Sequence, residues 1–448
     1  MNRLFGTNGI RWLTGDREPD FAVRLGNAAG MFFGSGKIIA IGMDTRTTSP
    51  MLESAVEAGA MTAGCNLVFL GVVPTPVVQF AVREMKLDGG LMITASHNPP
   101  EFNGIKFFSS DGTEFSRAQE IACEDIMADG KIRQEEWNRV GNRSQENNIQ
   151  GTYRASILKK MQNRGKKLLA IVDCANGTAI DYTPAILKSA GCQVQTLNAH
   201  ADGHFPGRMP EPVAENVGHL ISAVKTQGAD IGIAHDGDAD RATFVDDKGN
   251  YVTGDRSLAV FARDAIKRAG KGVVVIPINT SKVVQDVVES GGGKVEYTAI
   301  GSPLIARRMM ENGAILGGEG NGGAIFPEHQ YCRDGMMAAA RLTDIISGDG
   351  PLSGILAELP KYSIKSGKIR IDPRLKDRIM EEVKKQADGT VVELDGIKSV
   401  HGEHWSLVRA SGTEPLIRVT VETDNDAKCV KLLDEKMSQV KEIISRLS

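Results

Sequence analysis

"KIIAIGMDTRT", residues 37–47, is a strand-like pattern that occurs three times in this chain. A lysine opens the pattern, an apolar run follows, and polar residues close it. The other two versions are "KLLAIVDCANGT" (residues 167–178) and "KGVVVIPINTSK" (residues 271–282). Similar elements follow each version, so the chain up to about residue 330 is expected to hold three similar domains.

Each unit continues with a helical stretch and two further strand-like runs. The second runs follow a turn of small residues, as in "AGCNLVFLG" (63–71), "AGCQVQTLN" (190–198) and "GGGKVEYTAIG" (291–301). The third runs are "GGLMITASHNP" (89–99), "ADIGIAHDGDADR" (229–241) and "GAILGGEGNGG" (313–323). Strands that alternate with helices at this spacing predict an α/β fold with mixed or parallel sheets flanked by helices.

The tail of the chain has a different pattern. From about Ser366 it gives short strands, "TVVEL", "HWSLVRA" and "LIRVTVE", and a charged amphipathic helix over residues 426–447. We expect a smaller C-terminal α+β domain there. The predicted domains cover residues 1–148, 149–253, 254–364 and 365–448.

Polar motifs directly follow the third strand of each unit. In α/β sheets, ligands bind outside the carboxyl ends of the strands. Three similar domains could therefore present one motif each to a shared central cleft.

The composition is that of an ordinary globular protein. Of 448 residues, 41% are hydrophobic, 24% charged and 5% aromatic, with a net charge of −3. Sparse aromatic residues and evenly spread charges argue against a nucleic-acid partner. No run is long enough to span a bilayer, the first residues lack the apolar core of a signal peptide, and the six cysteines form no CxxC pair. We therefore expect a cytoplasmic protein with no membrane partner.

The acidic motif "HDGDADR" places Asp236, Asp238 and Asp240 at alternate positions. Two such charges ~4 Å apart repel by about 4 kcal/mol at an effective dielectric constant near 20, which a divalent cation would relieve. Oxygen ligands favour Mg²⁺ sharing its site with a phosphate. A calcium EF-hand is excluded, because its sixth position would be Arg241 and its twelfth Asp247. A solvated acidic turn is the alternative.

Ser96 in "TASHNP" is a candidate nucleophile at the end of a strand. The neighbouring His97 does not make a catalytic triad by adjacency alone, and the chain around Ser96 lacks the GxSxG pattern of acyl-transfer enzymes. A turn or helix-cap serine remains the alternative.

The loop "GGEGNGG" contains a formal GxGxxG pattern at Gly318, Gly320 and Gly323. A dinucleotide site would need a helix next, whereas "AIFPEH" has no helical period. The glycines instead let a backbone approach a small polar ligand, whose hydroxyl groups Glu319 and Asn321 could bind. A plain hairpin turn is the alternative.

The tail contains a donor-rich loop, "RASGTEPLIR". Guanidinium, hydroxyl and backbone N–H donors of this kind can bind a phosphate, although an ordinary polar turn is possible. His401 and His404 in "HGEH" resemble half a metal site, but a surface turn is favoured because no third ligand is near. The donor set of the loop is Arg409, Ser411, Gly412, Thr413 and Arg418.

Taken together, the motifs resemble those of the α-D-phosphohexomutase family. "FGTNGIR" (5–11) is similar to its N-terminal FGTxGxR, "TASHNP" to its phosphoserine loop, "DGDADR" to its metal loop, "GEGNGG" to its sugar-recognition loop and "RASGTEP" to its phosphate loop. The resemblance implies four domains around a central active-site cleft. It also implies a phosphosugar mutase that uses a phosphoserine and a bound sugar 1,6-bisphosphate, which would activate the dephosphorylated enzyme.

The resemblance also implies roles for individual residues. Ser96 would carry the phosphoryl group, with Lys106 as acid/base, Arg11 beside the phosphoserine and His97 next to it. Mg²⁺ would lie between Ser96 and the three aspartates. Glu319, Asn321 and Arg241 would form the sugar subsite. The phosphate that does not react would be bound by Arg409, Ser411, Gly412, Thr413 and Arg418.

The sugar-recognition loop departs from a common family form. GExSGH is frequent, but Asn321 and Gly323 stand in place of its serine and histidine, and His329 is a candidate replacement for that histidine. The motif "RDG" (333–335) is similar to the one in archaeal members of the family. "SGTEPLIRV" resembles the phosphoglucosamine mutases of the family, with glucose/mannose mutases as the alternative and phosphopentomutases after them. Two other functions stay open: a metal-dependent phosphatase and a non-catalytic phosphosugar-binding protein. The oligomeric state also stays open between a monomer and a homodimer.

Overall fold

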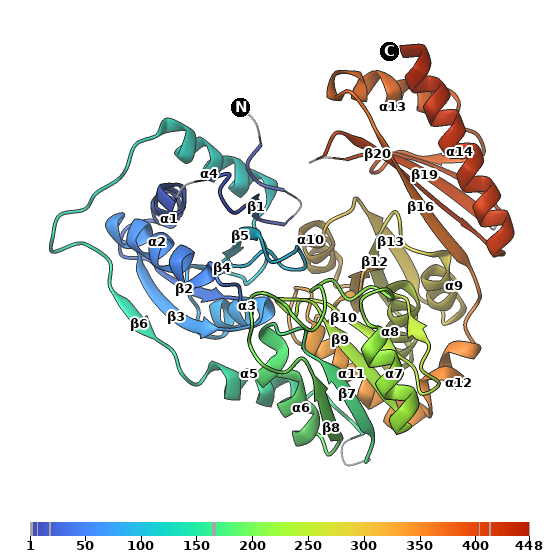
Figure 1. Ribbon diagram of the computed structural model, residues 1–448, viewed down its shortest axis with the longest axis horizontal. Helices are drawn as coiled ribbons and strands as arrows, with labels where there is room; N and C mark the ends of the chain where they lie inside the picture. The colour runs from blue at the N-terminus through green and yellow to red at the C-terminus, as the bar shows by residue number, and fades with distance from the viewer. Residues whose placement is uncertain are drawn as a thin grey trace.

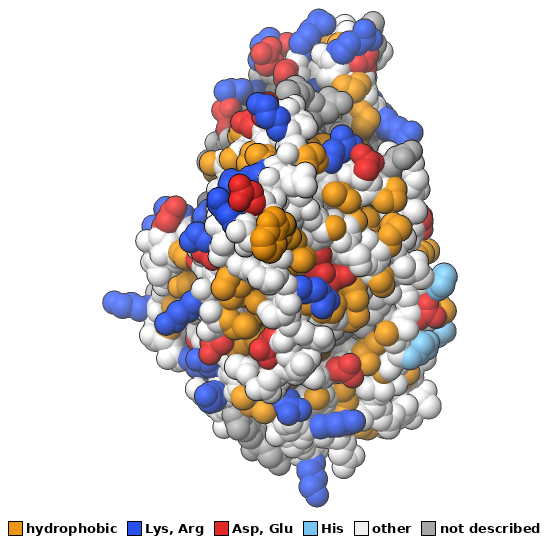
Figure 2. Space-filling view, turned by 90° about the vertical axis from the view of Figure 1, so that its left-hand side faces the viewer, with side chains coloured by type: hydrophobic (Ala, Val, Ile, Leu, Met, Phe, Trp, Pro, Cys, Tyr) orange, Lys and Arg blue, Asp and Glu red, His pale blue; other side chains and the backbone are white. Residues whose placement is uncertain are grey.

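Four β-sheets organise the described part of the chain. The computed structural model describes residues 3–6, 8–17, 19–163, 167–402, 404–411 and 414–447. The sheets and their helices lie along an arc, with the first and fourth sheets at its two ends (Figure 1). Among the described residues, no helix is long and apolar enough to cross a membrane. Basic and acidic side chains are interspersed on the face in Figure 2, without a large area of one sign.

The first three sheets share one topology, which confirms the predicted mixed-sheet α/β fold. Each repeated strand lies centrally, between parallel second and third strands, and a fourth strand returns antiparallel to the third. The shared orders are β3-β2-β4-β5, β8-β7-β9-β10 and β13-β12-β14-β15. The polar motifs therefore occupy the turns between the third and fourth strands.

The first sheet also has an edge strand at each side, β1 and β6.

Helices α1 and α2 pack closely because they carry glycines at their contact. A Cβ at Gly59 would overlap the carbonyl oxygen of Val23, and one at Gly26 would overlap that of Val56. The elements are β1 (Ile10–Leu13), α1 (Pro19–Phe33), β2 (Ile38–Met43), α2 (Ser49–Thr62), β3 (Asn66–Val72), α3 (Thr75–Glu84), β4 (Gly89–Ile93), β5 (Phe102–Ser109), α4 (Arg117–Asp129) and β6 (Arg143–Gln145).

The second and third domains share a hydrophobic core with the first. Phe80, Phe244 and Phe326, one from each, belong to a single buried cluster. The second domain has α5 (Ile149–Leu158), β7 (Leu169–Asp173), η1 (Thr178–Asp181), α6 (Thr183–Ser189), β8 (Gln193–Leu197), α7 (Gly218–Gln227), β9 (Ile231–His235), β10 (Ala242–Val245) and β11 (Tyr251–Val252). The third has α8 (Gly254–Ala269), β12 (Val273–Pro277), α9 (Lys282–Ser290), β13 (Lys294–Thr298), α10 (Ser302–Asn312), β14 (Leu316–Glu319), β15 (Gly323–Ile325), α11 (Gly335–Asp349) and α12 (Leu352–Ala357).

Because this core is continuous, it marks no break at residues 148 or 253, and the predicted domain boundaries stay predictions. Helix α11 contributes to the continuity, since it contacts α5 and α6 of the second domain as well as α8 of the third.

The C-terminal domain is the predicted small α+β unit. Its sheet is antiparallel throughout, and its own core includes Ile379, Val419 and Ile443. Trp405 and Leu407 pack on Ile278 of the third domain. The elements are β16 (Ser363–Arg370), η2 (Pro373–Leu375), α13 (Lys376–Lys385), β17 (Thr390–Val392), β18 (Ile397–His401), β19 (His404–Ala410), β20 (Leu416–Thr423) and α14 (Asp426–Leu447).

Candidate active site

Ser96 lies in a constrained loop after β4. Its φ is +53°, a left-handed conformation that costs a non-glycine residue roughly 1–2 kcal/mol. Its N–H donates to Oγ1 of Thr94 at 2.8 Å. The buried guanidinium of Arg46 donates to the carbonyl oxygens of Ser96 (3.1 Å) and Asn98 (2.6 Å). These contacts hold a strained serine in one position, as functional sites often do.

The acidic turn between β9 and β10 lies against this serine loop. Oδ2 of Asp236 is 3.4 Å from Oγ of Ser96. A Cβ at Gly237 would lie 2.7 Å from the carbonyl oxygen of Ser96, so the glycine permits the close approach of the two loops. The nucleophile candidate and the acidic motif, from different domains, therefore meet.

The three aspartates of this turn fit a divalent cation. Oxygen atoms of Asp236, Asp238 and Asp240 all lie within 4.8 Å of one another, and each residue is at most 1% exposed. Oδ1 of Asp238 and Oδ1 of Asp240 are buried without a hydrogen-bond partner among the described residues. Buried carboxylate oxygens normally have partners, and an oxygen-binding cation such as Mg²⁺ would supply one.

Lys106 on β5 pairs with two carboxylates of the acidic turn. Its ammonium nitrogen is 2.6 Å from Oδ2 of Asp238 and 2.9 Å from Oδ2 of Asp240. Burial alone would lower the pKa of Lys106, but the two carboxylates outweigh it and raise that pKa. Lys106 is therefore cationic in this arrangement.

Burial and neighbouring charges also shift the aspartates. Burial is the main cause that raises the pKa of Asp236 to about 7, although Arg241 donates from Nε to its Oδ2 at 2.8 Å. Burial opposes ionisation of Asp240 too, but Arg333 and Lys106 lower its pKa. The pKa values of Asp236 and Asp240 are thus shifted in opposite directions within one turn.

Arg11 and His97 lie beside the same loop. Arg11, on β1, donates from Nη1 to Oδ1 of Asn98 at 2.5 Å. Nδ1 of His97 is 3.4 Å from Oγ of Ser96. Burial, reinforced by the charges of Arg241 and Arg11, lowers the pKa of His97 to about 2, so the ring is neutral.

Glu319, in the loop "GGEGNGG", is connected to this cluster by Arg333, a residue for which the motifs predicted no role. Arg333 contacts Oε2 of Glu319 at 2.9 Å and Oδ2 of Asp240 at 2.7 Å. Asn321 turns toward its own loop, accepting from the N–H of Gly323 at 3.1 Å. The "RDG" motif (333–335), ten residues after the glycine loop, was the available sequence signal for Arg333. The backbone of the loop "GGEGNGG" is the hairpin turn that the sequence offered as the alternative to a ligand loop, since β14 pairs antiparallel with β15.

His329 does not lie with this loop. Its ring stacks on Phe80 and contacts Tyr153, and its Nδ1 is 3.3 Å from Oγ of Ser156. The structure therefore gives no support to His329 as a replacement for the family histidine.

The described residues of the tail motif belong to strands β19 and β20 and the residues beside them, in the fourth domain and apart from the cluster (Figure 1). Arg409 pairs with Asp395 at 2.8 Å, and Arg418 pairs with Glu414 at 2.9 Å. The carbonyl oxygen of Ser411 accepts from Lys376 at 3.0 Å. Gly412 and Thr413 lie outside the described residues. His401 and His404 end the β18–β19 hairpin.

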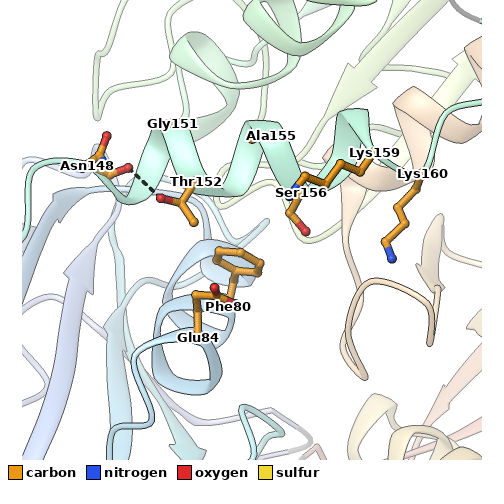
Figure 3. Close-up of a pocket in the computed structure, with 9 residues that line it drawn as sticks. All are labelled: Phe80, Glu84, Asn148, Gly151, Thr152, Ala155, Ser156, Lys159 and Lys160. Carbon is orange, nitrogen blue, oxygen red and sulfur yellow. Dashed lines mark hydrogen bonds between the residues drawn. The ribbon is translucent and has the colours of Figure 1, made fainter.

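The predicted residues do not line the surface hollow in Figure 3. This hollow, of about 500 Å³, lies between α3 and α5. Phe80 and Glu84 belong to one helix, and Thr152 and Ser156 to the other. Ser96, the acidic turn and Glu319, from the first three domains, are instead linked to one another by the contacts of Asp236 and Arg333.

Family comparison agrees with this arrangement. The four domain models of the phosphoglucomutase/phosphomannomutase family match the chain in order: alpha/beta/alpha domain I at residues 2–134, domain II at 152–249, domain III at 253–362 and the C-terminal domain at 370–440. The chain therefore belongs to the phosphoglucomutase/phosphomannomutase family.

Individual relatives cover all or nearly all of the chain. A probable phosphoglucosamine mutase from Methanopyrus kandleri is 40% identical over 452 residues, with 100% of both chains covered. A phosphoglucomutase/phosphomannomutase from Thermococcus kodakarensis is 36% identical, covering 98% of this chain and 100% of its own. A solved phosphoglucomutase/phosphomannomutase family protein from Burkholderia thailandensis has a TM-score of 0.89 at 27% identity, covering 99% of this chain and 98% of its own.

Proposed function

We propose that this chain is a phosphohexose mutase that moves a phosphoryl group between the 6- and 1-positions of a hexose phosphate, with glucosamine phosphate as the preferred sugar. The observation that carries the proposal is the meeting of Ser96 with the acidic turn, at 3.4 Å from Asp236, while Lys106 bridges Asp238 and Asp240. A nucleophile, a cation and a metal-binding turn in one water-poor site are the parts that phosphoryl transfer requires.

In the first half-reaction, phosphorylated Ser96 gives its phosphoryl group to the free hydroxyl of the sugar monophosphate. The bond between phosphorus and Oγ of Ser96 breaks as the sugar oxygen bonds to phosphorus. Lys106 gives a proton to the departing serine oxygen. Lys106 then takes up the proton that the attacking hydroxyl loses, so its charge is restored. The resulting bisphosphate turns over in the site, and its other phosphate returns to Ser96 by the reverse chemistry.

The charged residues around Ser96 supply the electrostatics. Asp236, Asp238, Asp240 and the phosphate on Ser96 would hold Mg²⁺, which when bound neutralises charge on the phosphoryl oxygens. Arg11 stabilises negative charge beside the serine loop. His97, as a neutral ring next to Ser96, orients the loop without adding charge.

The sugar and the phosphate that does not react are held away from Ser96. Glu319 accepts hydrogen bonds from sugar hydroxyls, with Asn321 and Arg241 in the same subsite. The phosphate clamp belongs to the C-terminal domain, which closes over the substrate and excludes the water that would hydrolyse a phosphoserine. The clamp residues are Arg409, Ser411, Gly412, Thr413 and Arg418.

Two observations favour glucosamine phosphate. The relative from Methanopyrus kandleri is a probable phosphoglucosamine mutase, and "SGTEPLIRV" resembles that group. We further propose that the enzyme acts in the cytoplasm as a monomer or a homodimer. The free thiols of the six cysteines are consistent with a reducing compartment.

A side-by-side assay tests this function. The protein is incubated with Mg²⁺, a trace of the matching bisphosphate, and the 1-phosphates of glucosamine, glucose, mannose or ribose, and ³¹P NMR follows the products. We expect glucosamine 6-phosphate to form fastest, without inorganic phosphate. Release of inorganic phosphate would identify a phosphatase, fastest turnover of ribose phosphate a pentomutase, and no turnover of any sugar a binding protein.

A further inference from the structure

Gly323 is a glycine for reasons of space. It lies on β15, where it is the Cα partner of Glu319 on β14. A side chain there has no room, because a Cβ at Gly323 would overlap Cδ of Arg333 and lie 3.1 Å from its Cγ. The aliphatic part of Arg333 therefore crosses the space above Gly323.

Arg333 reaches past Gly323 to two carboxylates of different domains. Its guanidinium contacts Oε2 of Glu319 at 2.9 Å and Oδ2 of Asp240 at 2.7 Å. Its side chain is only 10% exposed, and its backbone is held by a bridge to Ile325. The planar fork of an arginine suits two acceptors at fixed positions, which a lysine ammonium would not hold in the same way.

These contacts orient the Glu319 carboxylate. Arg333 and Asn321 both donate to Oε2, the latter at 3.4 Å. The other oxygen, Oε1, is then the one that can accept from an incoming hydroxyl. Without the guanidinium, the charge of Asp240 would repel Glu319 and turn it away from this orientation.

We propose that Arg333 is a positioning residue of the mutase site: it fixes Glu319 for the sugar and ties the sugar-recognition loop to the acidic turn, and Gly323 is required to let it pass. This inference rests on the proposed function, because it assigns Glu319 to the sugar. It predicts that Gly323 and Arg333 act as one unit in substrate binding.

A double-mutant cycle tests this unit. Binding of glucosamine 6-phosphate is measured by titration calorimetry with Mg²⁺ present, in a Ser96→Ala background that prevents turnover. We expect Arg333→Ala and Gly323→Ala each to weaken binding at least tenfold, the latter because its methyl displaces the arginine. The double variant should bind no more weakly than Arg333→Ala alone, and Arg333→Lys should be intermediate.

Arg341 provides a matched control. It is a 2% exposed arginine on α11 that pairs with Glu328 at 2.9 Å, away from the acidic turn. Arg341→Ala should lower the melting temperature and leave the affinity for glucosamine 6-phosphate within twofold, which separates lost stability from lost positioning. An equal loss of affinity in this control would overturn the inference.

Further outcomes separate the inference from the function on which it rests. Failure of Ser96→Ala to bind any hexose phosphate would remove both. If it binds, then an affinity unchanged by Arg333→Ala, or a double variant whose loss is the product of the two single losses, would overturn the inference alone.

Discussion

The ammonium nitrogen of Lys106 lies 2.6 Å from Oδ2 of Asp238, although β5 and the β9–β10 turn belong to different sheets. Thr75 of the first domain donates to the same carboxylate oxygen at 2.5 Å. Both charged side chains are at most 1% exposed. Parting the two domains would leave these charges without partners, which is costly for buried ion pairs. Side chains of the candidate site thus help, with the shared hydrophobic core, to hold the first two domains together.

Replacement of the candidate nucleophile gives the first prediction. Ser96→Ala should lower kcat at least about a thousandfold, as loss of a nucleophile does elsewhere, while the free energy of unfolding stays within about 1 kcal/mol of the wild type. Its side-chain contacts at 3.4 Å are too long to add much stability. Steady-state kinetics and urea denaturation measure the two quantities. Wild-type turnover in the variant would exclude a phosphoserine.

The acidic turn gives the second prediction. Asp238→Asn should weaken Mg²⁺ binding at least about tenfold, because the variant loses one of three anionic ligands. Calorimetric titration of Mg²⁺ into the protein measures this loss directly, and activity against Mg²⁺ concentration should shift in parallel.

Asp247→Asn is a suitable control for the metal experiment. Asp247 lies nearby in sequence but accepts from Ser353 outside the acidic turn, so its Mg²⁺ titration should match that of the wild type. Indistinguishable Mg²⁺ curves for the two variants would mean that the turn binds no cation.

The proposed phosphate clamp of the C-terminal domain gives the third prediction. Arg409→Ala should raise KM for the sugar phosphate about tenfold or more, with a smaller change in kcat. The pair with Asp395 is partly exposed, and such pairs contribute little to stability. Asp395→Asn is the matched control, because it removes the pair and keeps the guanidinium. A KM that rises equally in both variants would show that the ion pair, and not phosphate binding, is what Arg409 provides.

The repeated strand pattern predicted much of the fold, for a local reason. Apolar runs such as those around Ile39, Ile171 and Val275 form central strands because their side chains alternate between two covered faces. A single run does not show which strand it will lie beside. For this reason the antiparallel return of β5, and the edge positions of β1 and β6, did not follow from the pattern.

The residues of the candidate site could be predicted where they stand in a motif, but not where a distant residue joins them through tertiary contacts. Ser96 and the aspartates stand in compact motifs. Arg46 and Arg333 are connected to the candidate site only by contacts with residues far away in the sequence. Arg46 is 50 positions from Ser96, and Arg333 is 93 positions from Asp240. Arginines are common surface residues, so only tertiary packing distinguishes these two.

Lys398, at the contact between the third and fourth domains, gives a prediction on pH. It is 6% exposed, donates to the carbonyl oxygen of Ile278 at 2.7 Å, and lies 4.2 Å from the ring centre of Trp405. Burial lowers the pKa of Lys398 to about 8, against a weaker opposing effect of Glu422. Between that value and the ordinary lysine pKa near ~10.4, the unfolded chain binds more protons at this position than the folded protein does.

Lys398 should therefore make the free energy of unfolding rise with pH between about 8 and 10.4, by at most about 3 kcal/mol at ~1.4 kcal/mol per pH unit. Below pH 8 its contribution should be flat. Because tyrosines and other lysines titrate in the same window, the measured quantity is the difference between wild type and Lys398→Met in urea denaturation at pH 7.5 and pH 10. Lys431→Met, on the exposed face of α14, is the control and should follow the wild type. A Lys398→Met variant that gains as much stability as the wild type over this interval would show that the folded protein holds this lysine without a penalty.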